Sequence, residues 1–215
     1  MMQPEFEALE QCGFLVRDKL LPQLVFERHK QAVLQSWNSG NGWATRIKAG
    51  PEAKIFSRQD QSALEQIEPL VRAHAKNGEF QYLYHSMHEG RDEVGVIHSI
   101  FADVRAAWSD VIDLVAPDAT KTNLSLTSFT PGCFLDAHND HGDGSSKYRV
   151  TLLLYFGSES AEAGGLVFNY RGKKDVIAPL QNRSVLFVPT SETEHWIERV
   201  PNDSAPRLAL SGWLL

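Results

Sequence analysis

A series of short, strand-like segments after Thr122 is the feature that most constrains the fold. Six segments rich in branched and aromatic residues follow one another: NLSLTSF, YRVTLLLYF, GLVFNY, SVLFVP, HWIERV and RLALSGWLL. Turn-forming stretches that contain PG, HGDG, AGG, RGKKD and PNDSAP separate them. Strands at this density, without helices between them, favour a β-sandwich or barrel over an alternating βαβ sheet. We therefore predict a jelly-roll core.

The first 116 residues have a different pattern and are predicted to be mainly helical. Pro22 suits the first position of a helix because its ring fixes φ near the helical value. The apolar residues that could line the buried side of this helix are Leu24, Val25, Leu34 and Trp37. Further helices are expected over about 60–76 and over 96–115, where apolar residues recur at helical spacing. Short strands are expected at 14–16 and 80–84.

The sequence predicts a single domain. The 215 residues contain no internal repeat, low-complexity tract or long linker, and a chain of this length can bury one large core. We expect a single α+β domain over 1–215. Its mainly helical part covers about 1–116 and packs against a jelly-roll core at about 117–215.

Composition excludes several classes of protein. The formal net charge of -6 argues against broad binding to nucleic acid or to an anionic membrane. No apolar run reaches the length of about 18 residues that a membrane span needs. The first residues, MMQPEFEALEQ, have no apolar signal core, and Cys12 and Cys133 are expected to be unpaired thiols. We expect a cytoplasmic protein, monomeric or homodimeric, without nucleic-acid or membrane partners.

The segment FLDAHNDHGD, residues 134–143, is a candidate metal site. Residues i and i+2 of a strand face the same side, so His138 and Asp140 can approach one ion. A His-x-Asp triplet alone is weak, since about 0.4 are expected by chance in this composition. His195 starts a later strand and can supply a third ligand. Two histidines and one carboxylate form the facial arrangement of non-haem Fe(II) oxygenases, which leaves positions for a cosubstrate and O2.

Arg207 is a candidate partner for a carboxylate beside that metal. Alternation along its strand places it opposite a leucine face (Leu208, Leu210 and Leu214) that is expected to pack against the helices. The guanidinium then points into the barrel, where it suits a bidentate grip on a carboxylate. On the strand 148–156, Tyr155 faces the same interior and could offer its phenol to that carboxylate. A core Tyr155 and a surface Arg207 remain the alternative.

These segments resemble the prolyl-hydroxylase-like branch of the Fe(II)/2-oxoglutarate-dependent oxygenases. The resemblance covers about 122–215 and is carried by SFTPGCFLDAHND, YRVTLLLYF, EAGGLVFNY, SVLFVPTSETEHWIERV and RLALSGW. It implies a double-stranded β-helix (a jelly-roll, cupin-like core). The residues that it assigns to iron are His138, Asp140 and His195. Arg207 and Tyr155 are implied to bind 2-oxoglutarate, and we group Thr151 with them because it shares the face of Tyr155.

The resemblance also implies a reaction. We expect a dioxygenase that uses Fe(II), 2-oxoglutarate and O2, with ascorbate as a candidate reductant. It would hydroxylate an unactivated C–H bond of an amino acid, free or peptidyl, and release succinate and CO2. Phe129 replaces a tyrosine of many relatives, and the tryptophan that they carry before Gly164-Gly165 is absent. Both departures make a prolyl substrate less certain. The candidate substrate residues are Arg149, Phe129 and His141.

Four other functions fit these residues less well. A cupin-type metal oxygenase that does not use 2-oxoglutarate leaves Arg207 without a role. A non-catalytic jelly-roll binding module would not need a complete set of metal ligands. Asp140 argues against a halogenase, and Trp213 stands where nucleic-acid demethylases carry a second arginine. The stretch 83–95 is expected to be a polar loop at the entrance, so that its histidines are not ligands.

Overall fold

The computed structural model describes residues 3–50, 52–60, 62, 65–67, 69, 71, 80–141, 148–157 and 164–215. Its helices are α1 (Gln3–Cys12), α2 (Gln23–Ser39), α4 (Val96–Ala107) and α5 (Ser109–Val115), with a 3-10 turn, η1, at Glu89–Arg91. The first strands are β1 (Phe14–Arg17), β2 (Ala44–Lys48), β3 (Ala53–Ser57) and β4 (Tyr82–His88). The later strands are β5 (Thr122–Phe129), β6 (Phe134–His138), β7 (Val150–Tyr155), β8 (Leu166–Tyr170), β9 (Lys173–Ile177), β10 (Ser184–Phe187), β11 (Thr193–Ile197) and β12 (Arg207–Leu214).

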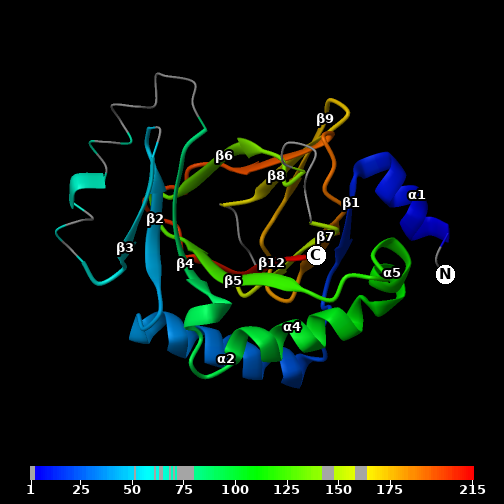
Figure 1. Ribbon diagram of the computed structural model, residues 1–215, viewed down its shortest axis with the longest axis horizontal. Coiled ribbons are helices and arrows are strands. Elements are labelled where there is room, and N and C mark those ends of the chain that lie inside the picture. The colour runs from blue at the N-terminus through cyan, green and yellow to red at the C-terminus, as the bar shows by residue number, and fades with distance from the viewer. Residues whose placement is uncertain are drawn as a thin grey trace.

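The strands form one curled antiparallel sheet. Its order is β1-β10-β7-β12-β5-β4-β6-β11-β8-β9, and β2 and β3 extend from β4. Strand β4 pairs with β5 on one wall and with β6 on the other, so the sheet folds over on itself and encloses an interior (Figure 1). We call β1-β10-β7-β12-β5-β4-β2 the large wall and β6-β11-β8-β9 the small wall. The predicted α+β fold with a jelly-roll core is confirmed.

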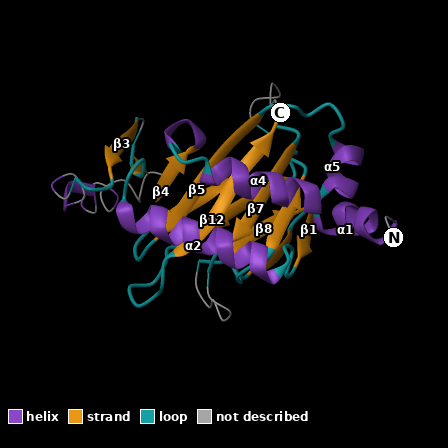
Figure 2. Cartoon of the chain, turned by 90° about the horizontal axis from the view of Figure 1, so that it is seen from below, coloured by secondary structure: helices purple, strands orange, loops and turns teal. Residues whose placement is uncertain are grey.

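Helices α2 and α4 lie across the outer face of the large wall (Figures 1 and 2). The residues of the leucine face, Leu208, Leu210 and Leu214, belong to one buried cluster with residues of both helices, among them Phe26 and Ile100. A second apolar cluster fills the interior between the walls and includes Tyr155, Phe168 and Ala209. Strand β7 lies between β10 and β12 and is buried along its length, and Thr151 is its one hydroxyl-bearing aliphatic residue among apolar and aromatic neighbours.

The N-terminal half is less helical than predicted. The strands expected at 14–16 and 80–84 are confirmed as β1 and β4, but β2 and β3 were missed. The stretch 83–88, expected to lie in a loop, belongs to β4, which pairs with three strands: β2, β5 and β6. Its mixed composition, YLYHSMH, obscures the strand pattern because its alternate residues face a cavity lined by both polar and aromatic side chains.

Two predicted helices need correction. Leu24 is 87% exposed and Leu34 is half-exposed, whereas the buried residues of α2 are Phe26, His29, Val33 and Trp37. The prediction holds for Trp37, which is buried, and for Val25, which packs against the core, but not for the two leucines. The buried side of α2 was misjudged because it includes a histidine: His29 Nε2 lies 2.7 Å from Asp103 Oδ2 of α4. The helix expected over 96–115 is divided at Trp108, whose indole donates to Ser184 Oγ at 2.9 Å.

The helix predicted over about 60–76 falls largely outside the described residues. Those described within it, 62, 65–67, 69 and 71, are helical. Within the described part of the chain, no helix is both long enough and apolar enough to cross a membrane.

Candidate metal centre

Three predicted ligands meet on the inner side of the small wall. His138 ends β6, and His195 of β11 lies directly opposite it in the antiparallel pairing. Asp140 follows in the turn after β6 rather than on the strand, yet its carboxylate still reaches both histidines. His138 Nε2 lies 3.7 Å from Asp140 Oδ1, and His195 Nε2 lies 3.8 Å from Asp140 Oδ2. The ligand atoms all lie within 4.8 Å of one another, so one ion can contact all three residues.

Backbone carbonyls orient both imidazoles. His138 Nδ1 lies 2.9 Å from the carbonyl oxygen of Asp136, and His195 Nδ1 lies 3.3 Å from that of Thr193. An Nδ1–H that donates to a carbonyl leaves the Nε2 lone pair available to a metal. In each case the carbonyl belongs to the residue two positions earlier, so the strand conformation itself selects the ligand atom. The structure therefore presents two Nε2 atoms to the same space.

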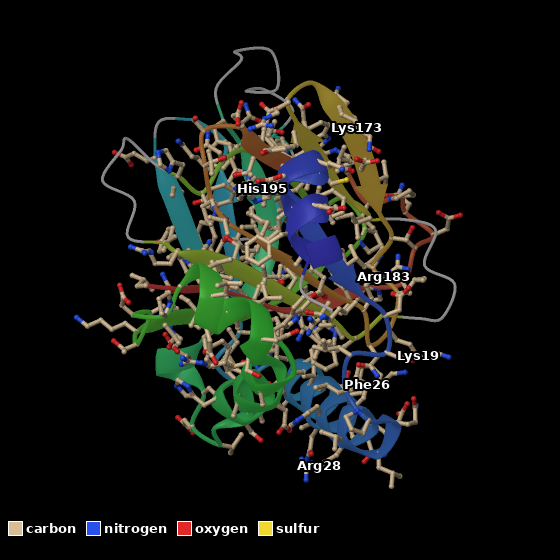
Figure 3. All side chains as sticks on the ribbon, turned by 90° about the vertical axis from the view of Figure 1, so that its right-hand side faces the viewer. Lys19, Phe26, Arg28, Lys173, Arg183 and His195 are labelled. Atoms are coloured by element: carbon tan, nitrogen blue, oxygen red, sulfur yellow. The ribbon has the colours of Figure 1, made fainter. Side chains whose placement is uncertain are left out.

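Burial keeps His195 neutral. The side chain is 6% exposed, and Figure 3 shows it within the stranded part of the molecule, far from Arg28 on α2. Removal from water, together with the neighbouring His138, lowers the pKa of His195 to about 4 against the opposing effect of Asp140. A neutral imidazole is the form that binds a metal, so the site is competent at physiological pH.

Two donors hold the buried carboxylate of Asp140. Thr151 Oγ1 on β7 and Trp213 Nε1 on β12 both donate to Asp140 Oδ2, each at 2.9 Å. Both donors come from the large wall, so they tie the ligand from one wall to the other. Charge-assisted hydrogen bonds of this kind restrict the rotation of the carboxylate. Thr151, grouped with the cosubstrate residues from the sequence, therefore has a defined partner in Asp140.

Arg207 is buried without a carboxylate partner among the described residues. It is 3% exposed, and its Nη2 donates to the Tyr155 hydroxyl at 3.3 Å. Its Nε has no hydrogen-bond partner among the described residues. The guanidinium carbon lies 4.9 Å from the ring centre of Tyr155 and 5.1 Å from that of Phe129. A buried cation without a counter-charge is costly, so this guanidinium is a candidate site for an anion.

Gly164 makes room for this arginine. Its φ is +70°, and a Cβ at this position would lie 3.1 Å from Arg207 Cδ. Glycine adopts positive φ without strain and has no side chain to occupy that space. The predicted Gly-Gly turn before a strand therefore has a physical role beside Arg207, since it precedes β8 directly.

A cavity of about 490 Å³ connects the metal ligands and Arg207. Strand alternation decides which residues line it: Tyr82, Tyr84, Ser86 and His88 of β4, and Asn123, Ser125, Thr127 and Phe129 of β5. The intervening residues Leu124 and Leu126 face the helices instead. Arg46 of β2 also lines this cavity. Arg46 and the β4 tyrosines were not predicted from the sequence, although the period of two over 82–88 could have indicated the tyrosines.

The three predicted substrate residues lie in different environments. Phe129 is buried and lines the cavity, and the ring of Tyr84 stacks on it at 5.4 Å. The side chain of Arg149 is exposed and does not line the cavity. His141 is half-buried in the turn after the ligands, outside the cavity lining. The geometry therefore supports Phe129 and gives no support to Arg149 or His141.

The other histidines of the expected loop are not metal ligands in this arrangement. His85 is buried behind β4, where Nδ1 lies 3.0 Å from Thr45 Oγ1 and Nε2 lies 3.2 Å from Thr130 Oγ1. Burial and, to a smaller extent, the positive charge of Arg58 together lower the pKa of His85 to about 4. His88 faces the cavity and lies 3.1 Å from Asn123 Oδ1.

A jelly roll with two histidines and one carboxylate on one side of an open cavity defines the class of non-haem metal oxygenases. Residues 124–215 match the family model described as the 2OG-Fe(II) oxygenase superfamily. This range contains all three ligands and Arg207. The part of the chain that carries the site is therefore similar to enzymes of the 2OG-Fe(II) oxygenase superfamily. The family and the ligand set together imply Fe(II) and 2-oxoglutarate.

Solved structures of low sequence identity share the fold. A prolyl-4-hydroxylase from Pseudomonas putida is 14% identical with a TM-score of 0.64, and the match covers 97% of this chain and 95% of that one. A Trichoplax adhaerens prolyl hydroxylase, solved with a hypoxia inducible factor peptide fragment, is 18% identical with a TM-score of 0.67, covering 97% and 86%. The α-ketoglutarate-dependent epimerase SnoN from nogalamycin biosynthesis is 9% identical with a TM-score of 0.63, covering 97% and 80%. A search of curated proteins finds no match to this chain.

Proposed function

We propose that the protein is a dioxygenase that hydroxylates an unactivated C–H bond of an amino acid, free or peptidyl. The observation that carries the proposal is the buried Arg207, with an Nε that lacks a partner among the described residues, beside a complete set of metal ligands. The cosubstrate 2-oxoglutarate has two carboxylates, so one can reach the metal while the other meets this guanidinium. Succinate and CO2 are the expected coproducts.

The roles of the residues follow from their donor atoms. His138, Asp140 and His195 hold Fe(II), whereas Arg207 and Tyr155 hold the far carboxylate of 2-oxoglutarate. When bound, iron and 2-oxoglutarate supply the oxidising chemistry that activates O2 toward a C–H bond, and ascorbate is a candidate reductant for the iron. Thr151 and Trp213 keep Asp140 in place, and the carbonyls of residues 136 and 193 hold the imidazoles.

The cavity supplies positioning and shelter. Its described lining is rich in aromatic rings, including Tyr82, Tyr84 and Phe129. Such walls exclude water and hold the reacting C–H bond in a fixed place, which favours reaction at one carbon. A cavity of about 490 Å³ has room for 2-oxoglutarate and a small substrate side by side.

Two other functions are less well supported. A metal oxygenase that does not use 2-oxoglutarate would leave Arg207 as an uncompensated buried charge. A non-catalytic binding module would not require two imidazoles held by carbonyls with their Nε2 atoms directed at one carboxylate. The fold itself does not choose the reaction, because one of the structural neighbours is an epimerase.

The direct test is turnover of 2-oxoglutarate by protein loaded with Fe(II) under nitrogen and then exposed to O2. Succinate is measured with and without a panel of amino acids and peptides. We expect a slow basal rate that a substrate accelerates, together with a product heavier by one oxygen atom. The proposal fails if no succinate forms while iron and 2-oxoglutarate are both shown to bind.

A further inference from the structure

Arg46 provides a second cationic group in the cavity. It comes from β2, outside the region that matches the family model, and it is half-buried. Its Nε donates to Ser86 Oγ, which fixes the direction of the guanidinium. Among the described residues, its Nη1 and Nη2 groups have no hydrogen-bond partner and no carboxylate forms an ion pair with it. The end of the guanidinium that can grip a carboxylate with two parallel bonds is therefore available.

Arg46 and Arg207 lie at opposite ends of one row across the large wall. Arg46 is paired with Tyr84, the ring of Tyr84 stacks on Phe129, and Phe129 is paired with Arg207. The row crosses three strand spacings, so the two arginine backbones are separated by about 14 Å along the sheet. The inner arginine is 3% exposed, whereas the outer one is half-exposed near the mouth. The rings of Tyr84 and Phe129 therefore lie between two positions, at Arg46 and at Arg207, where an anion can bind.

Charge in the cavity leaves Arg46 unbalanced. The charged side chains among the described lining residues are Arg46, Asp140 and Arg207, with the histidines counted as neutral. Fe(II) and the 2-oxoglutarate dianion cancel in formal charge, and so do Asp140 and Arg207. One positive charge, that of Arg46, remains in a partly dehydrated site. A further anion that enters with the substrate would neutralise it.

The groups around Arg46 are hydrogen-bond donors. Burial raises the pKa of the Tyr82 and Tyr84 phenols above the ordinary value, although Arg46 opposes the shift. Both phenols therefore keep their protons at neutral pH and can donate to an anion. A site with one guanidinium and two phenols favours an oxyanion over a neutral amide or an amine.

We propose that Arg46 binds a carboxylate of the substrate, so that the enzyme acts on a small carboxylic acid such as a free amino acid. This inference rests on the proposed function, because it concerns the second substrate of the same site. It differs from the expectation for Arg149, which lies outside the cavity. The carboxylate at Arg46 holds one end of the substrate at the mouth while the other end extends toward the metal ligands.

The test uses the full-length protein loaded with Fe(II) and 2-oxoglutarate. Succinate formation is measured with the common amino acids as free acids, as primary amides and as residues of capped peptides. We expect a free acid to accelerate turnover, and its amide to have a kcat/KM about 100-fold lower, since a charge-assisted pair is lost. Stimulation by a capped Asp or Glu peptide, without stimulation by any free acid, would overturn the inference, because the substrate would then be a peptide.

Variants separate this role from folding. Arg46→Gln is expected to raise the KM for the acid about 100-fold while the KM for 2-oxoglutarate changes less than about twofold. Arg46→Lys should recover part of the loss, and the exposed Arg149→Gln serves as the matched control with no change. Calorimetry of the acid with the Mn(II) and 2-oxoglutarate form, without O2, gives a readout that does not depend on turnover. The same weakening by Arg46→Gln is expected there.

Failure of the inference is distinguishable from failure of the proposed function. If basal succinate formation is present but no free acid stimulates it, the inference is wrong and the oxygenase function stands. The same holds if amides and neutral capped peptides equal the acids, or if Arg46→Gln matches the wild type. If iron-dependent turnover of 2-oxoglutarate is absent from the wild type, the proposed function itself is wrong.

Discussion

The two walls of the cavity hold their functional side chains in different ways. On the small wall, His138 and His195 are paired on adjacent strands, and backbone carbonyls two residues earlier orient them. On the large wall, Arg46 and Arg207 come from strands far apart in the chain and are separated by aromatic rings. The small wall fixes ligand atoms through the local conformation of the strand. The large wall positions two arginines that have no carboxylate partner among the described residues, which is what recognition of incoming anions requires.

The largest effect is expected when Asp140 is replaced, because this metal ligand is hydrogen-bonded to donors on the large wall. Asp140→Ala is expected to abolish Fe(II) binding and to lower turnover by a factor of about 10³ or more, because the only carboxylate among the three candidate ligands is lost. Titration with Fe(II) under nitrogen and succinate formation measure the two effects. The exposed Asp203→Ala is the control. Retained iron affinity in Asp140→Ala would contradict the assignment of the metal site.

Replacement of Arg207 should weaken the binding of 2-oxoglutarate without lowering the thermal stability of the protein. Arg207→Met is expected to raise the KM for 2-oxoglutarate about 100-fold, because the charge-assisted hydrogen bonds to its carboxylate are lost. The Tm without cosubstrate should not fall, since the variant removes a buried charge that has no carboxylate partner. Fe(II) titration, kinetics and thermal unfolding check these expectations. A weaker affinity for iron, in proportion to the loss for 2-oxoglutarate, would place Arg207 in a different role.

A smaller effect is expected when the link between the walls is weakened without removing a ligand. Thr151→Val deletes one of two donors to Asp140 Oδ2 and should weaken Fe(II) binding by about 10-fold to 100-fold. Trp213→Phe deletes the other donor. Because both act on one oxygen, the double variant should show a non-additive loss in metal affinity. Additive losses would indicate that the two donors do not act through Asp140.

His85, which is buried behind β4, is expected to make the free energy of unfolding depend on pH. The pKa of His85 is lowered to about 4 in the folded protein, so between pH 6.5 and 4 the unfolded state binds the extra proton. The free energy of unfolding should therefore fall as the pH falls through this range, with a contribution of about 1.4 kcal/mol per pH unit from this residue. In His85→Gln, urea unfolding at several pH values should lose that part of the slope. An unchanged slope would show that His85 does not contribute it.

Prediction from sequence succeeded where a local pattern carries the information. The short strands after Thr122, the leucine face of β12 and the inward direction of Arg207 all follow from a period of two. The failures lie where tertiary partners override local pattern. The buried His29 of α2 is stabilised by Asp103 of another helix, and the polar β4 is a strand because it pairs with three neighbours.

The sequence by itself determined the class of fold and the chemical identity of the metal ligands. His-x-Asp, a distant histidine and an arginine on a later strand are chemical types whose faces follow from strand alternation. Only the tertiary structure decided which side chains share the cavity with them. Arg46 is separated from Asp140 by more than ninety residues of chain, and its approach depends on the pairing of β2 with β4. Contacts between strands are set by packing and register, which no local stretch of sequence contains.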